Sequence, residues 1–110
     1  MNKKLDANKI TISRHAKQRL KERAGIHKKG QKNLLEKVIQ RGLQHGKTKG
    51  NLFKWMNKIM LNSPNGSRAY IYSNNVYIFA PTTEDHWNLI TVLPVAASLQ
   101  NLTRVIRSQV

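Results

Sequence analysis

Residues 12–26 of this chain read ISRHAKQRLKERAGI, and this stretch carries the start and stop signals of one helix. Ser13 is a favourable N-cap residue, because its hydroxyl can accept a hydrogen bond from a backbone N–H of the first turn. Gly25 suits the position after the last helical residue, where a positive φ costs glycine little. The sequence therefore predicts a helix over about residues 14–24.

Two stripes of residues distinguish the faces of this helix. Ala16, Leu20 and Ala24 recur at every fourth position, so they form a narrow apolar stripe that should face a core. At about 100° per residue, the flank of that stripe carries one imidazole and two guanidiniums. These belong to His15, Arg19 and Arg23. Such a flank suits the binding of a phosphodiester and, with the imidazole as proton acceptor, its cleavage.

The remaining pattern predicts more helices and then a sheet. Apolar residues at helical spacing predict helices over about 31–41 and 52–60, and Ser98 should cap a last helix that ends near residue 107. Residues rich in β-formers predict strands over 9–12, 68–73, 76–80 and 88–93, with Asn74-Asn75 as a hairpin turn. Residues 43–50 and 81–87 are expected to be loops. Five apolar residues should be buried between helices and sheet: Leu20, Leu35, Val38, Ile78 and Val92.

This order of elements predicts one α+β domain. Its N-terminal helices should pack on a three- to four-stranded antiparallel sheet, and a C-terminal helix should follow the sheet. Residues 1–9 are polar and basic, so they are expected to be a disordered N-terminus, and residues 10–110 should form the domain.

The charge of the chain points to a polyanionic partner. It has 110 residues, with 20 Lys+Arg against 5 Asp+Glu, and a formal net charge of +15. Nucleic acid, RNA first, is the leading partner, an anionic membrane surface is the second, and a merely solvated basic surface is the third. No apolar run is long enough for a membrane span or a signal core, which predicts a cytoplasmic protein without a membrane anchor. The absence of cysteine excludes disulfides and thiolate metal ligands.

The side chains favour metal-independent chemistry. Carboxylates are too few and too scattered for a divalent-ion nuclease, and the four histidines show no close metal-ligand spacing, so neither a metal nor another cofactor is expected. Metal-free RNA cleavage needs a base for the 2′-OH, an acid for the leaving oxygen and cations for the phosphorane. Histidine, with an ordinary pKa of about 6.5, suits the first two roles. The candidate catalytic residues are His15, Arg19, His45, Arg68 and Thr91.

A second set of residues is expected to bind nucleic acid without taking part in the chemistry. Its cations would neutralise phosphates, and a tryptophan at a strand edge would stack on a base. The set comprises Arg23, Lys47, Lys49, Lys54 and Trp87. The ordinary alternatives are a surface histidine at position 15, a loop histidine at position 45 and a core tryptophan.

The opening stretch resembles a known group of proteins. The residues Ser13-x-His15-Ala16, Arg19, Glu22-Arg23 and Gly25-Ile26 are similar to the start of small phage and toxin-type proteins near the RelE/ParE toxins. The helix end at 38–42 and the strand LITVL at 89–93 are similar to later markers of that group. Ala24 stands where a glycine is typical, and residues 82–87 resemble an insertion.

This resemblance implies the fold shared by barnase, EndoU, colicin and RelE ribonucleases, in which helices pack on an antiparallel sheet. By position, it implies that His15 and Arg19 contribute from the helix, and Arg68 and Thr91 from the sheet. The leading hypothesis is therefore a toxin-type, metal-independent endoribonuclease, held in check by an antitoxin or immunity protein. The alternatives are a non-catalytic phage or mobile-element protein that binds nucleic acid or a nucleotide signal, and a protein that coats DNA or ribosomes.

Overall fold

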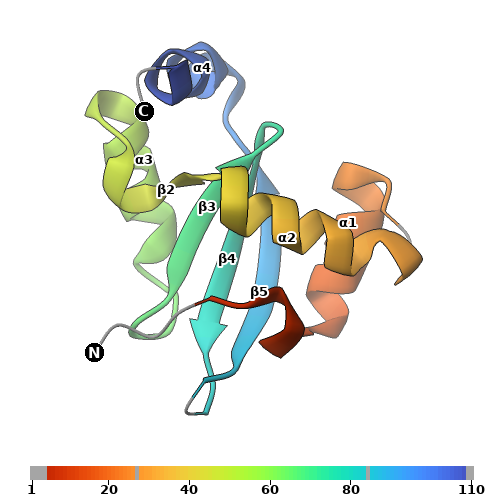
Figure 1. Ribbon diagram of the computed structural model, residues 1–110. Helices are drawn as coiled ribbons and strands as arrows, with labels where there is room; N and C mark the ends of the chain where they lie inside the picture. Colours follow the sequence, from red (N-terminus) through yellow and green to blue (C-terminus); the bar gives the residue numbers. More distant parts are fainter. Residues whose placement is uncertain (1–4, 27, 84, 109–110) are drawn as a thin grey trace.

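The computed structural model describes residues 5–26, 28–83 and 85–108, and it has the predicted α+β architecture (Figure 1). No helix within those ranges is long and apolar enough to cross a membrane. The helices are α1 (Arg14–Ala24), α2 (Gln31–Arg41), α3 (Gly50–Met60) and α4 (Gln100–Ser108). The strands are β1 (Ile10–Ile12), β2 (Leu43–Gln44), β3 (Arg68–Tyr72), β4 (Asn75–Pro81) and β5 (Trp87–Pro94). Short 3-10 turns are η1 (Ala7–Lys9), η2 (Lys28–Gly30), η3 (His45–Lys47) and η4 (Ala97–Leu99).

The five strands form one mixed sheet in the order β1-β5-β4-β3-β2. The pairs β2–β3, β3–β4 and β4–β5 are antiparallel, whereas β1 runs parallel to β5 with Ile10 opposite Trp87. The sheet therefore has more strands than the three or four expected. The additional strand is β2, which has only two residues and too short a pattern to be recognised in the sequence.

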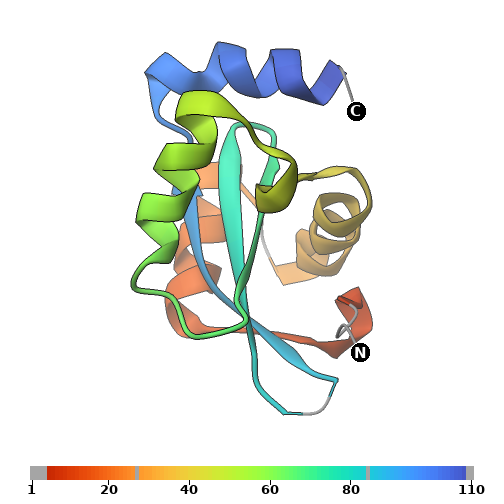
Figure 2. The ribbon, with the colours of Figure 1, turned by 90° about the vertical axis from the view of Figure 1, so that its left-hand side faces the viewer.

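The sheet is covered on both faces, and each face has its own core. Strand β5 and its neighbours pack against α1 and α2 through Leu20, Leu35, Val38 and Val92. The opposite face packs against α3 and α4, and Figure 2 shows α2 and α3 on the two sides of the sheet. The five residues expected to be buried are buried, with exposed fractions of 2% or less. Ile78 belongs to the α3/α4 side, because neighbouring strand residues point to opposite faces.

The predicted caps of α1 are confirmed. The Ser13 hydroxyl accepts a hydrogen bond from the Ala16 amide at 3.0 Å, and Gly25 ends the helix with φ at 64°. Helix α2 also ends at the predicted glycine, but Gly42 has an ordinary φ of −68°. A Cβ there would lie 2.3 Å from the Val38 carbonyl oxygen, so close approach to α2, rather than backbone freedom, requires the glycine.

Two predicted boundaries are corrected. The hairpin turn between β3 and β4 is Ser73-Asn74, where φ is 52° and 64°, one residue before the predicted Asn74-Asn75. Asn75 is instead the first residue of β4. Ser98 lies inside the η4 turn, so α4 begins at Gln100 without the predicted serine cap.

Part of the N-terminal segment that was expected to be disordered is described by the structure. Residues 1–4 lie outside the described residues, and residues 7–9 form the η1 turn. Leu5 is buried against the α1/α2 core, and the Asp6 carboxylate accepts a hydrogen bond from the Asn8 amide at 2.9 Å, which caps η1. The η1 turn lies in contact with α2.

Candidate functional site

The structure brings together His15 and Thr91, two candidate residues that are 76 positions apart in the chain. The His15 Nε2 lies 3.1 Å from the Thr91 hydroxyl oxygen. His15 is exposed and Thr91 is half-buried, so the imidazole can meet a ligand while one of its nitrogens is held. Since the hydroxyl can donate or accept, this hydrogen bond forms with either neutral tautomer of the ring.

This pairing depends on how the start of α1 is fixed to β5. The Ser13 amide donates to the Leu89 carbonyl oxygen at 3.1 Å, and its hydroxyl donates to the Ile90 carbonyl oxygen at 3.3 Å. The register between β5 and β4 shifts at this point. Thr91 pairs with Ile78, but Leu89, two residues earlier in β5, pairs with Phe79, the next residue of β4. Such bulges redirect side chains near functional sites. The first turn of α1 and the bulge together therefore place His15 beside Thr91.

Arg19 lies one turn after His15, and its guanidinium is paired along its own helix. Its Nη1 lies 3.1 Å from the Glu22 carboxylate, which also accepts from the Gln18 side-chain amide at 2.9 Å. The hydrogen bond from Gln18, followed by the charges of Arg19 and Arg23, lowers the pKa of Glu22. Arg19 is about one-third exposed, so it can exchange this surface pair for a phosphate.

His45 occupies a different part of the molecule, in the η3 turn beside β2. Its Nε2 lies 2.6 Å from the Asn57 side-chain carbonyl oxygen, and its ring centroid lies 5.4 Å from that of Phe53. A carbonyl oxygen only accepts, so the neutral His45 ring carries its proton on Nε2. His45 and Arg68 both line a pocket of about 260 Å³ at the edge of β3.

The Arg68 guanidinium does not join His45. It lies 4.9 Å from the ring of Trp87 on β5, in a cation–π contact that crosses β4. Trp87 itself is only 1% exposed and belongs to the α1/α2 core. The prediction that Trp87 stacks on a base is therefore wrong, because the alternation of β5 turns its ring inward under Arg68.

The five candidate catalytic residues therefore do not form one cluster. Helix α1 packs on β5, whereas β2 lies at the far edge of the sheet, beyond β4 and β3, and η3 follows it. Three strand spacings separate β5 from β2, which amounts to about 14 Å. His45 therefore does not belong to the group around His15, although the sequence proposed both as catalytic residues. One group is His15 with Thr91 and Arg19, and the other is His45 with the edge of β3.

Most residues expected to bind phosphate are accessible. Exposed side chains are found for Arg23, Lys47, Lys49 and Lys54. Lys47 also lines a small pocket between β2 and the end of α2. Arg23 lies on α1, Lys47 in η3 and Lys54 on α3, so these cations come from several elements of the structure.

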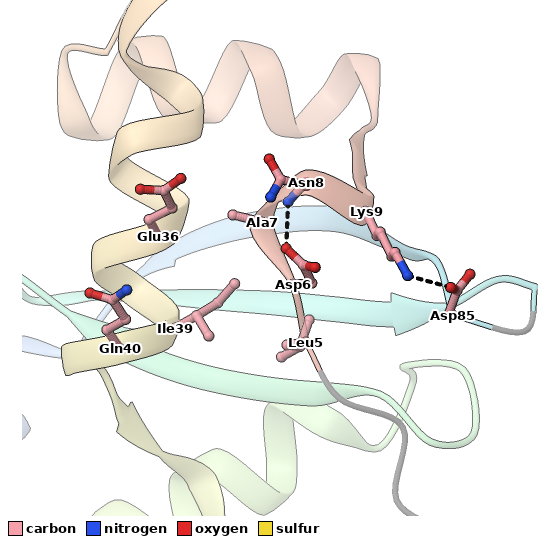
Figure 3. A pocket seen from close by; sticks show the side chains of 9 residues that line it. All are labelled: Leu5, Asp6, Ala7, Asn8, Lys9, Glu36, Ile39, Gln40 and Asp85. Carbon is pink, nitrogen blue, oxygen red and sulfur yellow. Dashed lines mark hydrogen bonds and ion pairs between the residues drawn. The ribbon is translucent and has the colours of Figure 1, made fainter.

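A feature that the sequence did not reveal is a pocket of about 640 Å³ between residues 5–9 and α2 (Figure 3). Glu36, Ile39 and Gln40 come from α2, and the opposite wall is the N-terminal segment. Of the chain's 5 acidic residues, three line this pocket: Asp6, Glu36 and Asp85. The Lys9 ammonium bonds to Asp85, which raises the pKa of Lys9 and lowers that of Asp85. The sequence signal for this region was weak: it consists of a few acidic residues in a basic chain, one of which, Asp6, can cap a turn. Phosphates should avoid a pocket lined by three carboxylates.

Metal-ligating side chains do not gather in the described part of the chain. Among residues 5–26, 28–83 and 85–108, no three His, Asp or Glu side chains lie close enough to hold an ion. Comparison with protein-family models, with curated proteins and with solved structures finds no match for this chain. The geometry described above is therefore the basis for a function.

Proposed function

We propose that the protein is a metal-independent endoribonuclease of toxin type, with His15 as the proton acceptor. The observation that carries this proposal is the hydrogen bond between His15 Nε2 and the Thr91 hydroxyl, 3.1 Å long, at an exposed position. This hydrogen bond joins a helix residue and a sheet residue, each of which the sequence analysis had proposed as a catalytic residue. A histidine held through one nitrogen has a fixed ring orientation, which proton transfer requires.

The chemistry follows from the atoms available. Thr91 holds the Nε2 side of the ring, so His15 Nδ1 is the nitrogen that takes the proton of an RNA 2′-OH. The 2′-oxygen then attacks the neighbouring phosphorus, and the bond from phosphorus to the 5′-oxygen breaks. The departing oxygen takes a proton from solvent, which leaves a 2′,3′-cyclic phosphate and a 5′-hydroxyl end. Arg19, released from Glu22, would neutralise charge on the phosphorane.

The first test is incubation of the purified protein with total RNA in excess EDTA. We expect cleavage products that end in a 2′,3′-cyclic phosphate, detected by their ligation with an RNA ligase that requires that end. Intact RNA under these conditions, with or without added divalent ions, would contradict the proposal.

One observation favours a second function, a protein that binds RNA without cleaving it. The two candidate histidines lie in different groups, so the His15 group has one imidazole where a base and an acid would ideally both be present. The net charge of +15 supports RNA binding in either case. Tight RNA binding in the absence of any cleavage would select this second function.

Salt dependence should report the contribution of the basic surface. RNA affinity is expected to fall about tenfold or more between about 50 and 200 mM salt, because neutralised phosphates release counterions. Replacing the exposed Lys47, Lys49 and Lys54 by alanine should make the plot of log affinity against log salt less steep, by about one for each phosphate that is no longer neutralised. Lys9→Ala is the control, because its ammonium is already paired with Asp85. Affinity that is independent of salt would exclude a backbone-dominated interface.

A further inference from the structure

Helix α3 has an aromatic side chain on a flank that does not face the core. Leu52 and Met56 on the core side of the helix are completely buried, whereas 39% of the Phe53 surface is accessible. Phe53 belongs to neither of the two cores. Asn57, one turn after Phe53 on the same side of the helix, is exposed as well. Packing of the core therefore does not account for a phenylalanine at this position.

A second ring holds Phe53 from the inside. The centroid of the His45 imidazole lies 5.4 Å from that of Phe53, with 35° between the two ring planes. The His45 Nε2 lies 2.6 Å from the Asn57 side-chain carbonyl oxygen, which fixes the imidazole on α3. The Thr48 amide and hydroxyl both donate to the His45 carbonyl oxygen and close the η3 turn. Phe53 is thus oriented before any ligand arrives, so binding costs little of its freedom.

Exposed lysines lie around this pair of rings. Lys49 is one turn before Phe53, and Lys54 follows Phe53 directly. Lys58 is one turn after Lys54, and all three lysines are exposed. In the described ranges of the chain, none of the three is in an ion pair with a carboxylate. Their charges are therefore available to a polyanion.

Acidic residues are segregated from this face. The chain has none between Glu36 and Glu84 and none after Asp85, so α3, α4 and the η3 turn contain no acidic residue. Three acidic residues line the pocket between the N-terminal segment and α2. Helices α2 and α3 lie on opposite faces of the sheet (Figure 2). A polyanion that approaches α3 consequently meets cations and an aromatic ring.

This combination favours single-stranded nucleic acid among polyanions. Lysines alone bind any chain of phosphates, because their contacts depend on charge and not on sequence. An accessible ring adds contact with the face of a base, and every base has such a face. In a duplex the neighbouring base pairs cover these faces, so only an unpaired, unstacked base can reach the ring.

We infer that Phe53, supported by His45, is a stacking platform for one unpaired base of RNA, and that Lys49 and Lys54 bind the phosphates beside that base. The inference rests on the proposed RNA substrate and specifies it as single-stranded. It also assigns a role to the part of the molecule around η3, which does not belong to the His15 group. Phe53 would hold the RNA while another part of the strand meets His15.

The test uses strands that cannot be cleaved, so it is separate from the test of catalysis. One ligand is a 2′-O-methyl oligoadenylate, which lacks the attacking 2′-OH, and the other is an abasic strand of the same length and charge. Fluorescence anisotropy at one salt concentration should show that the wild type binds the oligoadenylate about tenfold more tightly than the abasic strand. Phe53→Leu should lose most of this preference and bind the abasic strand within about twofold of wild type. Phe53→Tyr keeps a ring and is the matched control.

The lysines should respond in the opposite way. Replacing Lys49 and Lys54 together by alanine should weaken both strands by the same factor, because both carry the same phosphates. This variant should also make the plot of log affinity against log salt less steep, whereas Phe53→Leu should leave that slope unchanged.

Several results would overturn the inference. They are an equal loss of affinity for both strands in Phe53→Leu, no loss for either strand, and a polyglutamate peptide that binds more tightly than the oligoadenylate and depends on Phe53. If Phe53→Leu does not fold, photocrosslinking of the wild type to a 5-iodouridine strand decides the matter, since the crosslink must map to the peptide that contains Phe53. RNA cleavage without base-dependent binding would remove only the platform, whereas base-dependent binding without cleavage would keep the platform and remove the endoribonuclease.

Discussion

His15→Ala is expected to lower RNA cleavage by about 10²- to 10⁴-fold, the usual contribution of a general base. RNA affinity should stay within about twofold of wild type, because the imidazole is one of many groups on a surface whose affinity comes mainly from its cations. The melting temperature should change little, since His15 is exposed and its only described hydrogen bond is to Thr91. Initial cleavage rates and filter binding on the same preparation measure the two effects.

A second histidine provides the control for this substitution. His86 is also exposed, and its Nδ1 lies 3.1 Å from the adjacent Asp85 carboxylate. His86→Ala should cleave RNA at the wild-type rate. An equal loss of activity in both variants, or unfolding of His15→Ala, would contradict a catalytic role for His15.

Thr91 is expected to act through His15 as a positioning residue. Thr91→Val keeps the shape of the side chain and removes the hydroxyl, so the His15 ring loses its hydrogen bond at Nε2. We expect an activity loss of about tenfold, consistent with one hydrogen bond of about 1–1.5 kcal/mol, mainly in kcat. Thr91→Ser restores the hydroxyl and should recover most of the activity. A purely structural role would instead change the melting temperature of Thr91→Val and leave the activity of the folded protein intact.

Local signals explain why the helices could be predicted from the sequence. Ser13 and Gly25 each act within one or two turns of their own position, and the structure has α1 over the predicted residues. The same holds for α2, whereas α3 ends at the predicted residue but begins at Gly50, two residues before the expected start. Burial of Leu20 and Val38 followed from that periodicity, because an amphipathic helix has only one face to bury.

Long-range pairing explains what could not be predicted. A three-residue strand such as β1 has no local partner, and its parallel register with β5 is set only when the whole sheet forms. The same global step places β2 beyond β3 and thereby separates His45 from His15. Spacing along the chain contains no information about strand order, so the sequence could select candidate residues but could not show which of them meet. Trp87 illustrates a further limit, since a shift of one residue along a strand moves a ring to the opposite face of the sheet, and the sequence did not show that both faces are covered.

Leu20→Ala should cause the largest loss of stability among the substitutions considered. Leu20 is completely buried between α1 and the sheet, in the same core as Tyr77 and Val92. Truncation of such a leucine removes transfer free energy and leaves a cavity, so the free energy of unfolding should fall by about 2–5 kcal/mol. For a domain of this size, that corresponds to a decrease in melting temperature of roughly 10–20 °C.

Leu61→Ala is the matched control, because Leu61 follows α3 and is 79% exposed. Its free energy of unfolding should change by less than about 0.5 kcal/mol in a urea titration. Leu20 lies on the helix whose first turn carries His15. The Leu20→Ala variant can therefore separate the stability of the fold from the expected cleavage activity. At a temperature where Leu20→Ala is still folded, the Ser13 contacts to β5 keep His15 beside Thr91, and cleavage per folded molecule should remain near wild type. A loss of stability below about 1 kcal/mol would show that α1 does not pack on β5 through Leu20.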